Sequence, residues 1–320
     1  MADNVKSRVA VVLVTFNRKD LLCECLDALL AQTSPVSTIV LIDNASTDGT
    51  ADLLAKRGYL DNEVCDYVRL PLNSGGAGGF HEGVKRAYEA GFDWLWLMDD
   101  DVEPMPDALH RMLSHADVSQ CIQGCKVFRD GQSEDWERWA NIDESGRRSA
   151  SLEPPDLGYI RAETGCFEGM LINRQIISVI GFPDKRFFIG GDDVAYGYLA
   201  SKHTQVIYLR EACFLKKINK FGYPRLLERM RDRFFHRRSH RFYFLCVRNE
   251  ILLYGYMRDR VRVSRFSLRI GKMLLMHSVT TLLFERSPSN FVALWRGTFQ
   301  GYALLTSPFR EFDLGTIVTS

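Results

Sequence analysis

The sequence predicts an α/β fold, in which a mostly parallel sheet is flanked by helices and followed by an Arg-rich helical extension. Three observations support this prediction. Continuous apolar runs alternate with helical repeats over about the first 100 residues. Polar residues follow directly after each of these runs. The 320-residue chain is 46% hydrophobic and 25% charged, which is ordinary for a globular protein and excludes disorder, collagen and coiled coil for the whole.

The elements of the first 100 residues follow one another in a regular order. Residues 9–16 are a continuous run rich in valine and other apolar or β-branched residues, which is typical of a strand buried on both faces. Leucine and cysteine then recur at helical spacing between residues 21 and 30, so a helix is expected there. The same alternation predicts strands over 38–42, 67–70 and 94–98, and helices over 51–55 and 84–90.

The rest of the chain divides into two regions. Residues 126–162 are polar and irregular, and regular structure is expected again over 169–172, 176–181 and 206–209, with a helix after 192. From about residue 224 the sequence becomes Arg-rich and helical. We therefore predict a catalytic domain over 1–224 and a basic, aromatic-rich helical region over 225–320 that serves membrane association or oligomerisation.

Polar residues lie at or just after the end of each of the four predicted strands. Thr15 and Asn17 follow the first strand, Asp43 ends the second, and segments 73–79 and 99–101 follow the third and fourth. In sheets of this kind, ligands bind beyond the carboxyl ends of the strands. We therefore expect these four clusters to meet at one edge of the sheet.

The triplet of Asp99, Asp100 and Asp101 is the most distinctive feature. Three adjacent carboxylates repel one another unless a cation or hydrogen bonds neutralise them. Mg²⁺ is commonly held by one or two carboxylates together with substrate phosphates. The alternative is a solvated acidic turn that caps a helix beginning near Pro106. The triplet follows a buried strand, and Asp43 lies at the end of another strand. These positions favour the metal site.

The Gly-rich segment 73–79 fits no standard nucleotide fingerprint. It matches neither the dinucleotide pattern nor the phosphate-binding loop. A flexible turn is one interpretation. The other is a backbone that approaches a nucleotide closely and offers N–H groups to phosphate.

A second carboxylate pair, Asp192 and Asp193, follows two glycines. Neighbouring carboxyl groups can have their pKa values pushed apart, which leaves one of them suited to accept a proton. The alternative is an N-cap of the following helix, and we expect this of one member of the pair.

Four motifs in this order resemble the family-2 glycosyltransferases. They are VTFNR at 14–18, IDNASTDGT at 42–50, NSGG at 73–76 and DDD at 99–101. The resemblance covers roughly residues 8–220. It implies a GT-A fold and an inverting transfer from a nucleotide-diphosphate sugar. Segments 75–80 and 94–101 are most similar to bacterial galactofuranosyltransferases, with rhamnosyltransferases close.

The resemblance also implies roles for single residues. Thr15 and Asp43 would hold the uracil and ribose of the donor, while Asp99 and Asp101 match the metal-binding positions for Mg²⁺ or Mn²⁺. Asp193 matches the general base that deprotonates the acceptor hydroxyl. The full expected set is Asp193 and Asp192 for catalysis; Thr15, Asn17, Arg18, Asp43, Asn73, Gly75, Gly76, Asp99 and Asp100 for the donor; Asp99 and Asp101 for the metal; and Trp136, Trp139 and Glu168 for the acceptor.

One departure from the family concerns the metal. Relatives commonly place a metal-ligating histidine where this chain has Lys216 or Lys217. An ammonium group cannot ligate a metal, but it can pair with a diphosphate. We therefore expect one of these lysines to neutralise part of the donor's charge. His203 is an alternative ligand, but it precedes the strand rather than following it.

The net charge of +1 hides an uneven distribution. Residues 225–272 contain 14 basic and four acidic residues, interleaved with apolar ones that include Phe234, Phe235 and Tyr243. Such a basic amphipathic segment predicts docking on an anionic membrane surface, here the cytoplasmic leaflet. A solvated face is the alternative. The segment carries no recognised nucleic-acid motif, so nucleic-acid binding is not expected.

Cellular context and function class follow from the remaining features. No signal peptide is visible, and the eight scattered cysteines are expected to be reduced and buried in a cytoplasmic protein. A lipid-linked glycan acceptor fits a role in bacterial surface polysaccharide synthesis, and a homo-oligomer is possible through the C-terminal helices. A non-catalytic nucleotide-sugar binding module is the competing class, because it would need neither Asp193 nor a metal.

Overall fold

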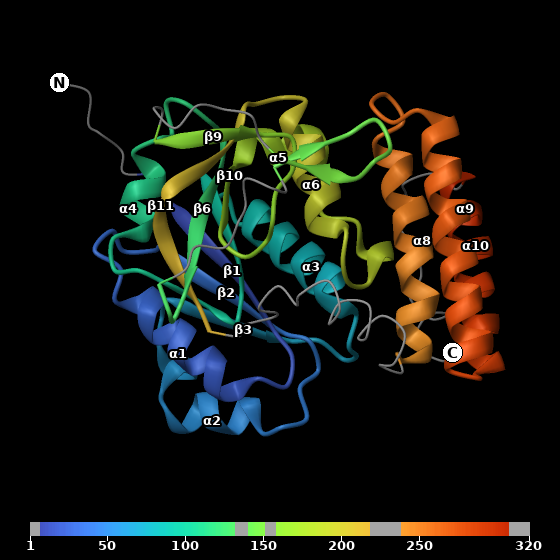
Figure 1. Ribbon diagram of the computed structural model, residues 1–320. Helices are drawn as coiled ribbons and strands as arrows, with labels where there is room; N and C mark the ends of the chain where they lie inside the picture. The colour runs from blue at the N-terminus through green and yellow to red at the C-terminus, as the bar shows by residue number, and fades with distance from the viewer. Residues whose placement is uncertain (1–6, 132–139, 151–157, 218–237, 307–320) are drawn as a thin grey trace.

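The valine-rich run near the start of the chain forms the centre of the sheet in the computed structural model, which describes residues 7–131, 140–150, 158–217 and 238–306 (Figure 1). Strand β1 (Val9–Thr15) pairs in parallel with β2 (Thr38–Asp43) on one side and with β4 (Trp94–Asp99) on the other. Strand β3 (Cys65–Arg69) pairs in parallel with β2 and continues the sheet. The predicted parallel arrangement is confirmed for this half.

Both faces of the sheet are covered by helices. Val9, Val11 and Leu13 of β1 point into one apolar core, and the alternating residues, such as Ala10 and Val12, point into the other. Burial on both faces explains why the strand is apolar throughout. The first core is closed by α1 (Lys19–Leu30), α2 (Thr50–Lys56) and α4 (Ala108–Leu113), and the second by α3 (Gly75–Glu89), α5 (Arg174–Ile180) and α6 (Asp192–Ser201).

The second half of the sheet has mixed pairing. Strand β10 (Met170–Asn173) runs antiparallel to both β4 and β6 (Cys121–Phe128). Strand β11 (Val206–Lys216) extends well beyond the expected 206–209 and lies parallel to β6. Short strands complete this part: β5 (Val102–Pro104) and β9 (Tyr159–Ala162) pair antiparallel with β11, and β7 (Asn141–Ile142) pairs with β8 (Arg148–Ser149).

The glycines of segment 75–79 belong to a helix rather than to a flexible turn. Helix α3 begins at Gly75, nine residues before the expected start at 84. A Cβ added at Gly79 would lie 2.6 Å from Val14, and one at Gly83 would lie 2.4 Å from Val12. These two glycines therefore allow α3 to pack closely on β1. The interpretation of this segment as a loop is wrong from Gly75 onward.

The C-terminal helical extension is confirmed, although the predicted boundary at 224 lies outside the described residues. Figure 1 shows α8, α9 and α10 side by side, with α8 facing α6 and the start of α3. The segment contains α8 (His240–Tyr256), α9 (Val263–Val279), a π-helical turn (Thr280–Phe284) and α10 (Pro288–Thr306). Among its described residues, no helix is both long and apolar enough to cross a bilayer.

Many apolar side chains in the described part of the basic segment, residues 238–272, are buried. Tyr243, Ile251 and Leu252 pack inside the helical bundle, so these three side chains are not available to a membrane surface. Three packed helices need a common apolar core, and these residues supply it. Exposed apolar side chains lie both within this segment, at Val263 and Leu268, and farther along the chain, among them Leu275, Leu283 and Phe299. Phe234 and Phe235 lie outside the described residues.

Candidate active site at the carboxyl edge of the sheet

The polar groups that follow β1 and β4 meet at the carboxyl edge of the sheet. The Thr15 hydroxyl donates to Asp100 Oδ2 at 2.7 Å. Arg18 Nη1 donates to Asp100 Oδ1 at 2.9 Å and to Asp101 Oδ2 at 3.2 Å. Burial raises the pKa of Asp100, while the Arg18 guanidinium and the Thr15 hydroxyl oppose that rise. Thr15 and Arg18 therefore brace the acidic triplet.

Three carboxylates lie together just beyond β4. Asp99, Asp101 and Glu168 each offer an oxygen, and these oxygens lie within 4.8 Å of one another. Burial, followed by the charges of Glu168 and Asp101, raises the pKa of Asp99 well above its ordinary value. Clustered carboxylate oxygens are the ligands that Mg²⁺ and Mn²⁺ prefer. The donor set therefore fits a divalent cation.

Glu168 lies in this cluster, held between two buried lysines. Its Oε2 accepts hydrogen bonds from Lys126 Nζ at 2.6 Å and Lys216 Nζ at 2.7 Å. Burial alone would raise the pKa of Glu168, but the two ammonium groups outweigh it and hold the pKa at about 2. Glu168 was expected at the acceptor, yet its contacts make it part of the acidic cluster. Lys126 was missed, although a lysine inside an apolar run such as 121–128 signals a buried ion pair.

The two candidate lysines point in different directions. Lys216 reaches the acidic cluster through Glu168. Lys217 pairs instead with Glu24 and, at 2.8 Å, with Glu103. Because consecutive residues of a strand face opposite sides, only Lys216 can project toward this site. His203 is exposed before β11, away from the cluster.

Asn44 connects the end of β2 to the start of α3. Its side-chain amide donates to the Gly75 carbonyl at 2.7 Å and accepts from Ser74 N at 2.9 Å. Asn73 Oδ1 accepts from Gly75 N at 2.8 Å. Gly76 has open space where a side chain would be. The predicted donor residues Asn73, Gly75 and Gly76 thus form a braced turn, and Asn44, which we did not assign to the site, holds it.

Asp43 and Asn17 lie at the neighbouring strand ends. Asp43 is fully buried, and its oxygens accept from the Tyr67 hydroxyl at 2.7 Å and from Ser46 N at 2.8 Å. Asn17 is exposed in the left-handed region, with φ of 53°, and accepts from Thr47 N. Both residues therefore shape the loops that follow β1 and β2.

The pair of Asp192 and Asp193 begins α6. Asp192 is buried, and burial together with Asp193 raises the pKa of its carboxyl to about 8. Asp193 is half-buried and accepts from Val194 N at 2.8 Å. Of the two, Asp193 is therefore the more accessible to a substrate. The charge of Asp192 also contributes to the raised pKa of Asp99, so Asp192 lies near the acidic cluster.

Helix α8 holds the loop that leads to this pair. Arg248 is fully buried and donates to the carbonyls of Arg186 and Phe187. Asn249 Nδ2 donates at 2.9 Å to each of the carbonyls of Ile189 and Gly190. Sequence analysis missed both residues, because their role depends on contacts across about 60 residues of chain. Trp136 and Trp139, the other acceptor candidates, lie outside the described residues.

The sequence matches a known family and several of its members. Residues 10–181 match the model of Glycosyl transferase family 2. The chain is 32% identical over 199 residues to the galactofuranosyltransferase GlfT1 of Mycobacterium tuberculosis and 28% over 202 residues to that of Mycolicibacterium smegmatis. Each match covers 58% of this chain but only 62% and 63% of those proteins, so the chain spans less than two thirds of their length.

Solved structures with little sequence similarity share the fold. A mannosyltransferase from Pyrobaculum calidifontis, solved with GDP-Man and Mn²⁺, aligns over 94% of this chain and 79% of its own, with a TM-score of 0.55 and 18% identity. S. aureus TarS with UDP-GlcNAc aligns over 92% of each chain, with a TM-score of 0.54 and 12% identity. The family match covers more than half of the chain and agrees with this GT-A-like architecture. The chain therefore belongs to glycosyl transferase family 2.

Proposed function

We propose that this chain is an inverting glycosyltransferase that uses a nucleotide-diphosphate sugar. The observation that carries the proposal is the cluster of Asp99, Asp101 and Glu168 at the carboxyl edge of the sheet, together with the nearby pair of Asp192 and Asp193, of which Asp192 acts electrostatically on Asp99. Carboxylates that can hold a cation and a separate accessible carboxylate are the two groups that sugar transfer from a diphosphate requires. A module that only binds sugar nucleotides does not need the separate accessible carboxylate.

The proposed reaction is a single displacement. The Asp193 carboxylate takes the proton of the acceptor hydroxyl, whose oxygen attacks the anomeric carbon of the donor sugar. The bond between this carbon and the diphosphate oxygen breaks on the opposite face, so the configuration inverts. Lys216, held at the cluster by Glu168, would add positive charge near the departing diphosphate.

The cofactor proposed for the acidic cluster is Mg²⁺ or Mn²⁺. Asp99 and Asp101 would hold it, with Glu168 beside them and oriented by two lysines. When bound, the cation would stabilise negative charge on the leaving diphosphate. The Pyrobaculum relative was solved with Mn²⁺ and a nucleotide sugar, which supports this choice.

Donor and acceptor are proposed from the relatives. Galactofuranose from UDP-galactofuranose is our best candidate, because galactofuranosyltransferases are among the most similar curated proteins. Rhamnose from dTDP-rhamnose is the alternative. The proposed acceptor is a lipid-linked or oligosaccharide glycan of a bacterial surface polysaccharide, built at the cytoplasmic face of the membrane.

A panel of sugar nucleotides tests the proposal. Release of nucleoside diphosphate in the presence of acceptor is expected for UDP-galactofuranose, and excess chelator is expected to reduce it at least about a hundredfold. Restoration by Mg²⁺ or Mn²⁺ is the control. Binding without release for every donor would favour the non-catalytic module, and full activity in chelator would remove the metal from the mechanism.

We propose that the chain docks on an anionic membrane through α9, the π-helical turn and α10, rather than through the whole basic segment 225–272. Exposed apolar side chains on α9, the π-helical turn and α10 include Leu275 (67% exposed), Leu283 (69%) and Phe299 (69%). Basic residues such as Arg286 and Arg296 are exposed beside them. Apolar side chains flanked by cations suit the surface of an anionic leaflet.

Flotation with liposomes checks this docking. We expect the chain to float with anionic vesicles, and expect a variant with Leu283→Asp and Phe299→Asp to remain at the bottom of the gradient. Val179→Asp is the matched control, since Val179 is also exposed (61%) but belongs to α5. Absence of flotation at physiological salt would exclude membrane docking. Self-association lost in the double variant would assign the surface to an oligomer instead.

A further inference from the structure

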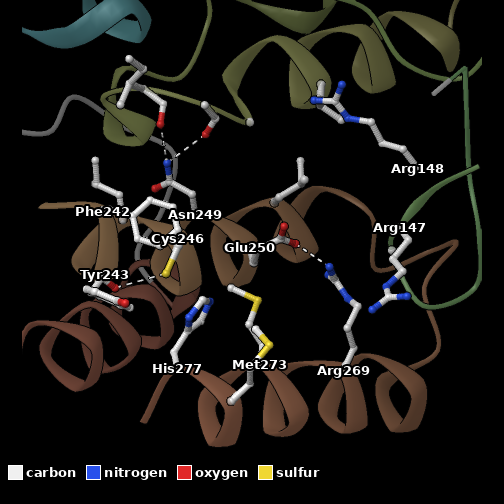
Figure 2. Close-up of a pocket in the computed structure, with 18 of the residues that line it drawn as sticks. Arg147, Arg148, Phe242, Tyr243, Cys246, Asn249, Glu250, Arg269, Met273 and His277 are labelled. Carbon is white, nitrogen blue, oxygen red and sulfur yellow. Dashed lines mark hydrogen bonds and ion pairs between the residues drawn. The ribbon is translucent and has the colours of Figure 1, made fainter. Parts of the chain in front are cut away.

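A large pocket opens between the C-terminal helices and the catalytic part of the chain. Its volume is about 1290 Å³. Helices α8 and α9 line one side, and residues 142–148 and 189–194 contribute to the other (Figure 2). Asp99 and Asp101 are not among the described residues that line it, so the pocket is separate from the carboxylate cluster. Pockets for small ligands usually measure roughly 300–1,000 Å³, so this one accommodates a longer molecule.

The charge of the lining residues is strongly positive. Six basic side chains line the pocket: Arg147, Arg148, Arg238, Arg241, Arg269 and Lys272. The single acidic residue among the described lining residues is Glu250, and it already pairs with Arg269 at 2.7 Å. Among the described residues, the charge of Arg147 acts on the nearby Asp143, whose carboxylate also accepts from Ser145 and from Arg147 N. The pocket therefore favours an anionic group, and above all a phosphate, which arginine binds through paired N–H groups.

An apolar wall lies beside these basic groups. Met273 and Met276 of α9 line the pocket together with Leu253 of α8, and Ile189 at the loop is 58% exposed. Figure 2 shows Met273 and His277 on α9, with Arg147 and Arg148 on the segment across from them. Methionine side chains are flexible and polarisable, so they adapt to an irregular hydrocarbon chain. A purely polar anion would leave this wall in contact with water.

The pocket also reaches the loop that precedes the proposed general base. Gly190 and Gly191 line it, and Asp192 and Asp193 follow directly in the chain. Asn249, another lining residue, holds the carbonyls of Ile189 and Gly190 (Figure 2). A ligand in the pocket therefore lies beside the loop that presents Asp193.

We propose that this pocket binds the phosphorylated hydrocarbon chain of the acceptor, with its phosphate among the arginines and its chain along the methionines. The inference rests on the proposed function, because it assumes that Asp193 activates an acceptor hydroxyl. Charge complementarity selects the phosphate, the apolar wall selects the hydrocarbon, and the contact with the Gly190–Gly191 turn places the attached sugar near Asp193.

Three acceptors with the same terminal sugar test the proposal on the full-length chain. The first carries the sugar on a long-chain hydrocarbon diphosphate, the second on the same chain through an uncharged ether, and the third on methyl diphosphate. We expect the first to have the lowest KM, by about tenfold or more over either of the others. Equal KM values for the charged and uncharged long-chain acceptors would overturn the proposal.

Two variants assign the effect to the pocket. The double variant Arg147→Gln with Arg148→Gln is expected to raise the KM for the diphosphate acceptor about tenfold and leave the donor KM unchanged. Met276→Gln is expected to raise the KM for the long-chain acceptor but not for methyl diphosphate. Arg57→Gln, at an exposed arginine of another face, is the matched control. Unchanged acceptor KM in both pocket variants, with normal melting, would exclude this site.

A binding measurement separates this inference from the proposed function. Equilibrium binding of a long-chain hydrocarbon diphosphate without any sugar is followed by calorimetry, and the Arg147 and Arg148 double variant is expected to weaken it about tenfold. If no donor is turned over but this binding persists, the transferase proposal fails, whereas the proposal that the pocket binds the lipid diphosphate is supported. If transfer proceeds but the diphosphate does not bind, the pocket proposal fails.

Discussion

Replacing Asp193 with asparagine is expected to lower kcat by about 10²–10⁴-fold, the range that a general base contributes. Asparagine keeps the shape of the side chain and its hydrogen bond from Val194 N, but it cannot take a proton. Donor binding should be nearly unchanged, because Asp193 is not a member of the carboxylate cluster. Steady-state kinetics and donor binding by calorimetry measure the two effects separately.

Asp192→Asn is the matched control for this prediction. Because burial and Asp193 raise the pKa of Asp192 to about 8, much of it is already protonated and neutral near pH 7. An asparagine resembles that neutral form, so we expect at most a several-fold change in kcat. If Asp192→Asn abolishes transfer while Asp193→Asn retains wild-type turnover, the two residues exchange roles and the mechanism must be reassigned.

Replacing Arg248 with methionine is expected to lower the free energy of unfolding by about 2–4 kcal/mol. Its guanidinium is fully buried and donates to the carbonyls of Arg186 and Phe187, and its Nε donates to Asn249 at 3.0 Å. Methionine fills part of the volume but leaves those carbonyls without this donor. Urea denaturation measures the loss.

The same variant should also lower kcat, because the loop held by Arg248 leads to Asp193. Arg258→Met is the control: Arg258 is exposed after α8, and its replacement should change stability by less than about 0.5 kcal/mol. Equal stability loss in the two variants would show that the buried hydrogen bonds contribute little. A stable Arg248→Met variant with normal kcat would show that the loop before Asp193 does not depend on the Arg248 side chain.

The sequence was sufficient where local pattern determines structure. Strands buried on both faces must be apolar throughout, so β1, β2 and β4 could be predicted together with the polar residues at their ends. Because the carboxyl ends of parallel strands share one edge, the proximity of Thr15 to Asp100 also followed from the sequence.

The sequence was insufficient where packing between distant segments determines the conformation or the role of a residue. Glycines at 75–79 suggest a loop by propensity, but the close approach of α3 to Val14 requires a small residue inside a helix. Lys216 and Lys217 are identical in type, and only the register of β11 shows which one faces Glu168. The aromatic residues of α8 resemble a membrane face until the helices that cover them are known.

The main chain around Gly75 contacts both the turn proposed to bind the donor and the segment that leads to Asp193. The Asn44 side chain donates to the Gly75 carbonyl, while Ala77 N, in the same turn of the helix, donates to the Phe188 carbonyl at 3.1 Å. A Cβ at position 75 would lie 1.9 Å from that Phe188 oxygen. Any side chain there would push away the segment that ends in Asp193. The proposed donor site and the proposed base therefore meet at a position that leaves no room for a side chain, so we expect differences in substrate choice to arise from the other residues around it.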